Sequence, residues 1–321
     1  MSVESEARLI RVSGADGLTL AAWDYGGAGP VVCFVHGFGH DHHVWDEIAP
    51  AFVGQFRVIA LDLRGHGASD RDPGFRYHHV SIGKDLGAAL VALGAERVTL
   101  VAHSTAGHAA IGFAARFPEC LERLVLVDAG AELRASGGGG DRGERRTRDG
   151  DGSFASVGDY VAELARHHPA APPERLARLA AHWLRCRDDG RYEPTLDPMF
   201  WRPRVPRAGK PAGESPAGET TSARASEAEK RSVGFDRKAW AEEGEAALWR
   251  DLAAIRCPVL AVRGAESPML SAATVERMTR ESLADGRAVE IPGSGHVPMI
   301  DQPALFLAAL GRFLLDSKPR A

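Results

Sequence analysis

Two side chains far apart in the sequence, those of Ser104 and His296, are suited to nucleophilic chemistry. Ser104 stands between a short apolar run at 98–102 and a helical pattern with an apolar face at 105–117. A serine hydroxyl becomes an effective nucleophile when a neighbouring base accepts its proton. Imidazole titrates near neutral pH, so it is the side chain suited to take that proton and return it. The pair therefore predicts acyl transfer through a serine.

Small residues flank Ser104 on both sides. The string Ala-His-Ser-Thr-Ala places Ala102 two positions before it and Ala106 two positions after it, and Gly107 follows. At a very tight turn between a strand and a helix these flanking side chains crowd one another, so they must be small, and alanine brings more strain than glycine. The same string also fits a serine that caps an ordinary helix. The neighbouring motifs favour the nucleophile.

Three further motifs stand directly after strand-like apolar runs. The string His-Gly-Phe-Gly (36–39) follows one run, and Asp-Leu-Arg-Gly-His-Gly-Ala-Ser-Asp (62–70) follows the next. His296 lies in a loop containing proline and glycine, between the last apolar run and the final helical pattern. Open α/β sheets bind ligands at the carboxyl ends of their strands. We expect the 62–70 string to anchor the loops beside the site and assign it no chemistry.

The elements that must position these residues alternate between strand and helix. The first strand-like segments flank Ala15-Asp16-Gly17 and predict an antiparallel hairpin. Short apolar runs typical of buried parallel strands then recur along the chain. Those runs end at Val35, Leu61, Ala102, Asp128, Val262 and Ile291. The alternation predicts an α/β protein with a doubly wound, mostly parallel, eight-stranded sheet.

The alternation breaks between Glu132 and Leu252, where apolar residues follow helical spacing. This predicts a helical cap inserted after the sixth strand, with the core at 1–132 and 253–321 and the cap at 133–252. Two stretches rich in Gly, Pro, Ser and charge are expected to be mobile loops, because they cannot bury enough apolar surface to order themselves. They lie near 136–152 and 203–234. Aromatic residues predicted to line a pocket under the cap, or to pack in its core, are Trp183, Phe200, Trp201 and Trp240.

With these motifs in this order, the chain resembles the α/β-hydrolase fold superfamily. The string around Ser104 is similar to the nucleophile elbow, usually written G-x-S-x-G, with alanine at both glycine positions. The order of serine, acid and histidine also matches. The resemblance covers about Leu18 to Glu132 and Ile255 to Leu315. It implies a serine hydrolase in which Ser104 is the nucleophile and His296 its general base.

The resemblance also implies an oxyanion hole, which stabilises the negative oxygen of a tetrahedral intermediate. Residue by residue, its two backbone N–H donors fall on Phe38, after the His-Gly pair, and on Thr105, after the nucleophile. Gly37 directly precedes Phe38, His103 directly precedes Ser104, and both are expected substrate-binding positions.

The acid that would orient His296 has two candidates. Most members of the superfamily place it after the seventh strand, where this chain reads Arg-Gly-Ala-Glu-Ser-Pro. The usual acid position there holds Ser267, and Glu266 stands one residue early. A subgroup with a similar turn carries its acid after the sixth strand, which here offers Asp128. We favour Asp128 and keep Glu266 as the alternative.

A serine at the elbow argues against the members that need a carboxylate nucleophile, such as haloalkane dehalogenases. The expected function is hydrolysis of a small molecule at a carboxylic ester, a lactone, an amide or an activated C–C bond. Two alternatives remain. One is a cofactor-free dioxygenase on the same fold, a group whose early loop contains a similar His-Asp-His string. The other is a small-molecule receptor without turnover.

Composition narrows the choice of partners. The net charge is −4 with no long basic stripe, so nucleic acid is not an expected partner. The first residues carry no secretory signal, and no apolar run is long enough to span a membrane. Four scattered cysteines suit a reducing cytoplasm. We expect a cytoplasmic monomer or homodimer without cofactor or metal, although the loop at 39–45 is rich in histidine.

Overall fold

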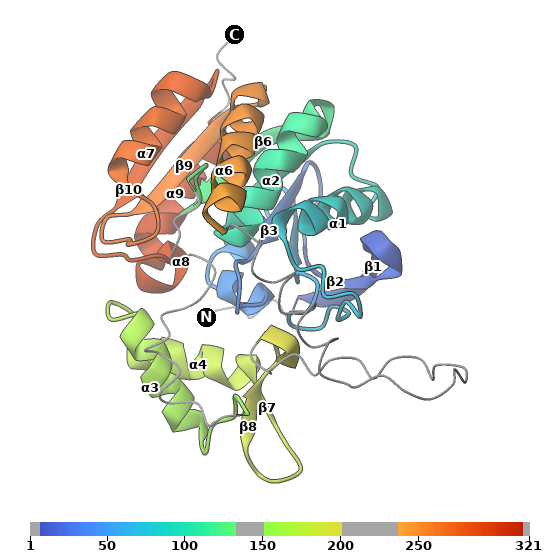
Figure 1. Cartoon of the computed structure of the whole chain (residues 1–321), viewed down its shortest axis with the longest axis vertical. Helices are drawn as coiled ribbons and strands as arrows, with labels where there is room; N and C mark the ends of the chain where they lie inside the picture. The colour runs from blue at the N-terminus through green and yellow to red at the C-terminus, as the bar shows by residue number, and fades with distance from the viewer. Residues whose placement is uncertain (1–6, 133–150, 201–236, 317–321) are drawn as a thin grey trace, which may run out of the picture.

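An eight-stranded sheet forms the centre of the molecule in the computed structural model, which describes residues 7–132, 151–200 and 237–316, and only the backbone of 237–243 (Figure 1). The strand order is β1-β2-β4-β3-β5-β6-β9-β10. β2 pairs antiparallel with both β1 and β4, and the remaining pairs are parallel. These strands are β1 (Arg8–Ser13), β2 (Thr19–Gly26), β3 (Val31–Val35), β4 (Arg57–Leu61), β5 (Val98–His103), β6 (Leu121–Val127), β9 (Val259–Gly264) and β10 (Gly286–Ile291).

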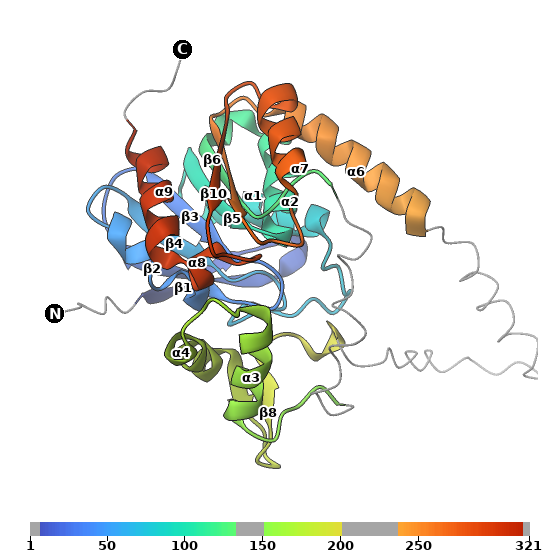
Figure 2. The same cartoon turned by 90° about the vertical axis from the view of Figure 1, so that its left-hand side faces the viewer.

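Helices cover both faces of the sheet, as Figure 2 shows. On one face lie α1 (His79–Ala92), α2 (Thr105–Arg116), α6 (Arg237–Ala254) and α7 (Ala272–Arg277). On the other lie α8 (Pro298–Asp301) and α9 (Pro303–Leu315). Short 3-10 helices are η1 (Ala15–Gly17), η2 (His42–Trp45), η3 (Ala49–Phe52), η4 (Pro118–Cys120) and η6 (Pro198–Phe200), and η7 (Met278–Ser282) is a π-helix. This arrangement confirms the predicted doubly wound sheet and its α/β class.

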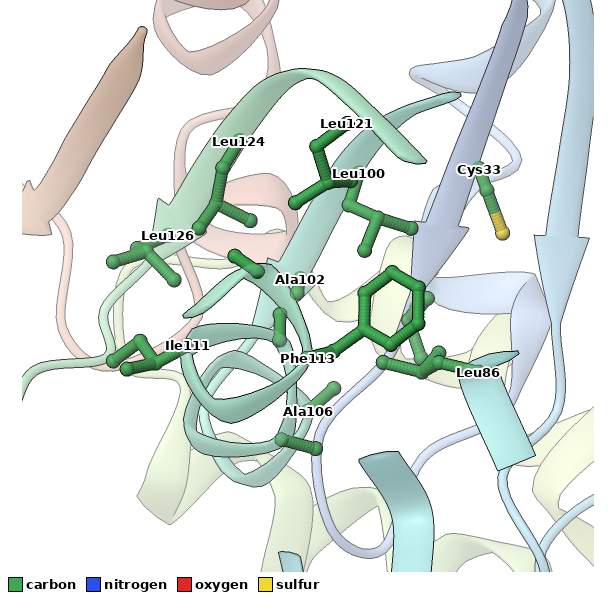
Figure 3. Packing of buried hydrophobic residues seen from close by; sticks show 14 of the residues in the cluster. Cys33, Leu86, Leu100, Ala102, Ala106, Ile111, Phe113, Leu121, Leu124 and Leu126 are labelled. Carbon is green, nitrogen blue, oxygen red and sulfur yellow. The ribbon is translucent and has the colours of Figure 1, made fainter. Parts of the chain in front are cut away.

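Alternation along the buried strands divides the core into two layers. In β3, whose five residues are all buried, Cys33 joins the cluster on the α2 side while Val32 and Phe34 join the cluster on the α9 side. Figure 3 shows Leu100 and Phe113 packed between β5 and α2. Because both faces are covered by helices, these strands are continuous apolar runs, which is why the sequence reveals them.

A helical cap follows β6, as predicted, and lies across one end of the sheet in both views (Figures 1 and 2). Among the described residues it contains α3 (Val157–His167), α4 (Pro173–Trp183) and the antiparallel pair β7 (Leu184–Cys186) and β8 (Tyr192–Pro194). The indole N–H of Trp183 donates to Asp41 Oδ1 at 2.7 Å, and the N–H of Asp197 donates to the Gly65 carbonyl at 2.8 Å. These contacts tie the cap to the loops that follow β3 and β4.

The boundaries predicted for the cap, residues 133 and 252, stay a prediction. The expected mobile loops fall outside the described residues, except for residues 151 and 152. The C-terminal boundary at residue 252 falls inside α6, where Leu248 and Leu252 join the core cluster shared with α2. By its packing this part of α6 belongs with the core. None of the helices among the described residues has both the length and the apolar character needed to cross a bilayer.

Buried Arg64 anchors the 62–70 loop to α1. Its side chain is fully buried and donates to both carboxylate oxygens of Asp85, at 2.6 and 2.7 Å, and to Asp72 at 3.2 Å. Removing one partner of a buried ion pair leaves an uncompensated charge, so Arg64→Ala should lower the free energy of unfolding by about 3–5 kcal/mol. The exposed pair of Arg97 with Glu122 is the control, and Arg97→Ala should cost about 1 kcal/mol or less. Urea unfolding measures both, and equal losses would contradict the role given to Arg64.

Candidate functional site

Ser104 occupies a strained turn between β5 and α2. Its φ of 52° and ψ of −119° lie in a region that side-chain-bearing residues rarely adopt. The turn is held on both sides, because the Ser104 N–H donates to the Val127 carbonyl at 3.0 Å and the Gly107 N–H donates to the Ser104 carbonyl at 2.8 Å. Such strain persists only where the surroundings fix it, and it is the geometry of a nucleophile elbow.

Close packing around this turn explains its small residues. Ala102 and Ala106 are fully buried, as the sequence predicts. A Cβ on Gly107 would lie 2.3 Å from the Cβ of Ala129, so the elbow also needs a glycine at this position. Gly37, predicted to bind substrate, lies against Ser104, since a Cβ there would be 2.9 Å from the Cβ of Ser104. A larger residue at position 37 would therefore displace the serine, while contact with substrate stays a prediction.

A continuous chain of hydrogen bonds joins Ser104, His296 and Asp128. The imidazole Nε2 lies 2.9 Å from Ser104 Oγ, and Nδ1 lies 2.6 Å from Asp128 Oδ2. Asp128 is buried, whereas the His296 side chain is 27% exposed, so the ring sits between the core and the surface. A carboxylate on Nδ1 makes that nitrogen the protonated one, which leaves the Nε2 lone pair directed at the serine hydroxyl.

The turn after β9 donates two hydrogen bonds to Asp128, and its own carboxylate, that of Glu266, makes no contact with His296. Ser267, at the usual acid position, donates its hydroxyl to Asp128 Oδ2 at 2.5 Å, and the Gly264 N–H donates to Oδ1 at 3.0 Å. Glu266 is exposed, and its N–H donates to the Ser294 carbonyl at 2.9 Å. The structure thus brings Asp128 to the imidazole and leaves the Glu266 side chain at the surface. Sequence reasoning missed the part played by Ser267, although a hydroxyl at an acid position was a signal for it.

Several contacts fix the loop that carries His296. Asp301 is buried and its Oδ2 accepts the Gly295 N–H at 2.8 Å. His103, which directly precedes Ser104, donates Nε2–H to the His296 carbonyl at 2.9 Å. Burial holds the pKa of His103 well below its usual value, so the ring is neutral at pH 7. With 1% of its surface exposed, His103 contacts the histidine loop, and the expected contact with substrate stays a prediction.

Two backbone N–H groups beside Ser104 are free to bind an oxyanion. Within the described part of the chain, neither the Phe38 N–H nor the Thr105 N–H, which opens α2, has a backbone acceptor. His36 orients the first of them, since its Nδ1 donates to the Gly37 carbonyl at 2.7 Å while its Nε2 accepts the Leu63 N–H at 3.0 Å. In a planar trans peptide, holding the carbonyl toward His36 points the Phe38 N–H the opposite way.

The histidine-rich loop is bound into the surrounding structure. Asp41, His42 and His43 each offer a ligand atom within 4.8 Å of the others, a grouping that a metal ion would fit by composition. All three already have partners, because Asp41 accepts the Trp183 indole N–H at 2.7 Å, His42 Nδ1 lies 3.2 Å from Asp62 and His43 Nδ1 lies 2.7 Å from Asp46. These contacts give Asp41 and His42, two residues of the His-Asp-His string, a structural role. The expectation that no metal binds stays a prediction.

The predicted pocket aromatics divide between two roles. Trp183 is buried at the contact between cap and core, so it packs rather than lines a pocket. Phe200 lies with its ring centroid 4.9 Å from that of Phe38, at the exposed side of the site. Trp201 and the side chain of Trp240 lie outside the described residues.

Comparison with known proteins agrees with this geometry. A 2-(acetamidomethylene)succinate hydrolase from Mesorhizobium japonicum is 25% identical over 288 residues, which cover 90% of this chain and 89% of that protein. A solved structure of an esterase from Mycobacterium tuberculosis has a TM-score of 0.66 and 26% identity, covering 97% of this chain and 93% of that one.

Other relatives match over a shorter stretch. Uncharacterized proteins of Mycobacterium tuberculosis and Mycobacterium bovis are 38% identical to this chain over 109 residues. The match spans 34% of this chain and 32% of each of those proteins. The family profile described as alpha/beta hydrolase fold matches residues 30–303. The chain therefore belongs to the alpha/beta hydrolase fold family.

Proposed function

We propose that the protein is a serine hydrolase that cleaves a carboxylic ester, or a related carbonyl compound, of a small molecule through a covalent acyl-enzyme. The observation that carries the proposal is the hydrogen-bonded chain from Ser104 Oγ through His296 to Asp128. A serine, a histidine and a buried carboxylate in this order form a catalytic triad, which is recognised by its geometry.

The reaction follows from the positions of the protons. Ser104 Oγ attacks the carbonyl carbon while His296 Nε2 takes the hydroxyl proton, and the buried carboxylate of Asp128 stabilises the imidazolium that forms. The carbonyl oxygen becomes an oxyanion, which the N–H groups of Phe38 and Thr105 stabilise. Collapse of the intermediate expels the alcohol, which takes the proton back from His296. A water molecule then repeats the sequence on the acyl-enzyme and releases the acid.

The relatives support hydrolysis as the reaction class. The Mesorhizobium protein is named as a hydrolase of 2-(acetamidomethylene)succinate, and the Mycobacterium structure is named as an esterase. Both names describe hydrolytic enzymes. Asp41 and His42 of the His-Asp-His string are bound in structural contacts, which lend the dioxygenase no support, and the intact hydrogen-bond chain argues against a receptor without turnover.

An activity-based probe tests this proposal directly. A fluorophosphonate should label the native protein at a single site, because only an activated serine attacks it at neutral pH, and peptide mapping should place the label on Ser104. Ser271 is a matched control, since its hydroxyl accepts the Thr274 N–H at 3.0 Å and so caps α7 in the ordinary way. Ser271→Ala should label like the native protein, and Ser104→Ala should not label. A label on any other residue, or none, would contradict the proposed nucleophile.

A further inference from the structure

An aromatic hollow lies against Phe200, whose ring contacts that of Phe38. Its volume is about 310 Å³, and its lining is formed by Phe75, Tyr77, His78, Met199 and Phe200. The Phe38 ring is 52% exposed and meets the Phe200 ring edge to face, with centroids 4.9 Å apart. Phe38 directly follows the glycine packed against Ser104, so its ring links the hollow to the candidate site.

One wall of the hollow is a strained phenylalanine. Phe75 has a φ of 56°, a left-handed conformation that costs a bulky residue free energy, yet 41% of its surface is exposed. Buried Asp72 holds it there, accepting the Phe75 N–H with its carbonyl at 2.9 Å and the Gly74 and Arg76 N–H groups with its carboxylate at 2.8 and 2.9 Å. The strained backbone of Phe75 therefore places an apolar ring near solvent.

The opposite wall comes from the cap. Asp197 fixes the start of η6, because it donates its N–H to the Gly65 carbonyl at 2.8 Å and accepts the Met199 N–H at 2.9 Å. Its carboxylate also accepts the hydroxyl of Tyr77, which joins the cap wall to the wall before α1. The Phe200 ring packs on Tyr77 with centroids 4.6 Å apart. Both walls are thus held in place before any ligand binds.

The chemistry of the lining selects the ligand. Four of its five residues present aromatic or thioether surface, and the Tyr77 hydroxyl is already bonded to Asp197. Among the described residues the lining contains no carboxylate or guanidinium, so a cation would lose its water there without gaining a charged partner. Aromatic edges and faces favour flat rings, and the volume is at the lower end of the range for ligand pockets, about 300–1,000 Å³.

We infer that this hollow is a subsite for an aryl or similarly sized apolar arm of the substrate, held next to the carbonyl that Ser104 attacks. The inference rests on the proposed serine hydrolase function and narrows its substrate class to esters with such an arm. Phe75 and Phe200 are its specificity-determining residues, with Phe75 supplied by the core and Phe200 by the cap.

The first test compares esters with and without the arm. The variants Phe75→Ala and Phe200→Ala are assayed with 2-phenylethyl acetate, whose aryl arm is on the alcohol side of the carbonyl, and with methyl phenylacetate, whose arm is on the acyl side. In both variants, kcat/KM for at least one of these two esters should fall about 10-fold, while kcat/KM for methyl acetate should change less than about threefold. Leu305→Ala, an exposed apolar residue on α9, is the control and should change neither. Equal losses for arylated and plain esters would overturn the subsite.

The second test does not depend on catalysis. Ser104→Ala should bind 2-naphthol, measured by equilibrium dialysis, and adding Phe75→Gly should weaken binding about 10-fold or more. Because glycine adopts a positive φ without strain, Phe75→Gly should leave Tm unchanged or higher, which separates loss of the subsite from loss of the fold. Unaltered binding in the double variant, or a lowered Tm, would contradict the inference. Retained naphthol binding in a native protein that cleaves no ester would refute the proposed hydrolase and leave the subsite standing.

Discussion

Replacing Ser104 with alanine is expected to lower kcat for ester hydrolysis by about 10⁴- to 10⁶-fold. The reason is that no other hydroxyl lies on His296 Nε2, which is 2.9 Å from Ser104 Oγ, so the covalent step has no second nucleophile within the described residues. The Phe38 and Thr105 N–H groups of the proposed oxyanion hole remain in Ser104→Ala, and we expect them to account for the residual activity. Steady-state kinetics with the best ester substrate measures the effect.

Two controls make the result specific. His296→Ala should lose a similar factor, and the double variant Ser104→Ala/His296→Ala should lose little more than either single variant, because the residues act as one unit. Additive losses would mean that the two side chains work independently and would contradict the proposed acyl-enzyme. Thermal unfolding of Ser104→Ala should stay close to that of the native protein, since the change removes a single half-buried hydroxyl.

The central sheet could be predicted because burial on both faces leaves a signature in the sequence. Every residue of β3 is buried, so the strand is an uninterrupted apolar run that stands out from its neighbours. The place of α6 could not be predicted in the same way. An amphipathic pattern says that Leu248 and Leu252 face an apolar surface, but it does not say whether the core or the cap provides that surface.

Residues of the candidate site that directly follow a strand could be predicted from the sequence, whereas contacts between residues far apart in the sequence could not. Ser104 and His296 follow recognisable strands, and topology then brings their side chains to the same edge of the sheet. The bond from Ser267 to Asp128 joins residues 139 positions apart and depends on the register of β6 beside β9. The strained backbone of Phe75 has no sequence signal, because a phenylalanine is among the residues least expected at a positive φ.

Replacing Asp128 with asparagine is expected to lower kcat by about 10⁴-fold, although the shape of the side chain hardly changes. Three donors converge on this carboxylate: the His296 Nδ1–H at 2.6 Å and the Ser267 hydroxyl at 2.5 Å on Oδ2, and the Gly264 N–H at 3.0 Å on Oδ1. An amide has one oxygen for them, so its NH₂ group must face either a donor or the imidazole. Facing the imidazole, it selects the wrong tautomer, and in either orientation the charge that stabilises the imidazolium is lost.

The matched variant is Glu266→Gln, which removes the other carboxylate considered for the same role. The Glu266 side chain is exposed, and the backbone N–H of Glu266 donates to the Ser294 carbonyl at 2.9 Å. Because this substitution leaves the backbone contact in place, kcat should change less than about threefold. Both variants are compared with the native protein on one ester under identical conditions. A loss of several decades in Glu266→Gln with near-native kcat in Asp128→Asn would reverse the assignment. Losses of similar size in both would mean that the turn after β9 must move before the imidazole is oriented, since the two carboxylates do not share a contact with His296 in this structure.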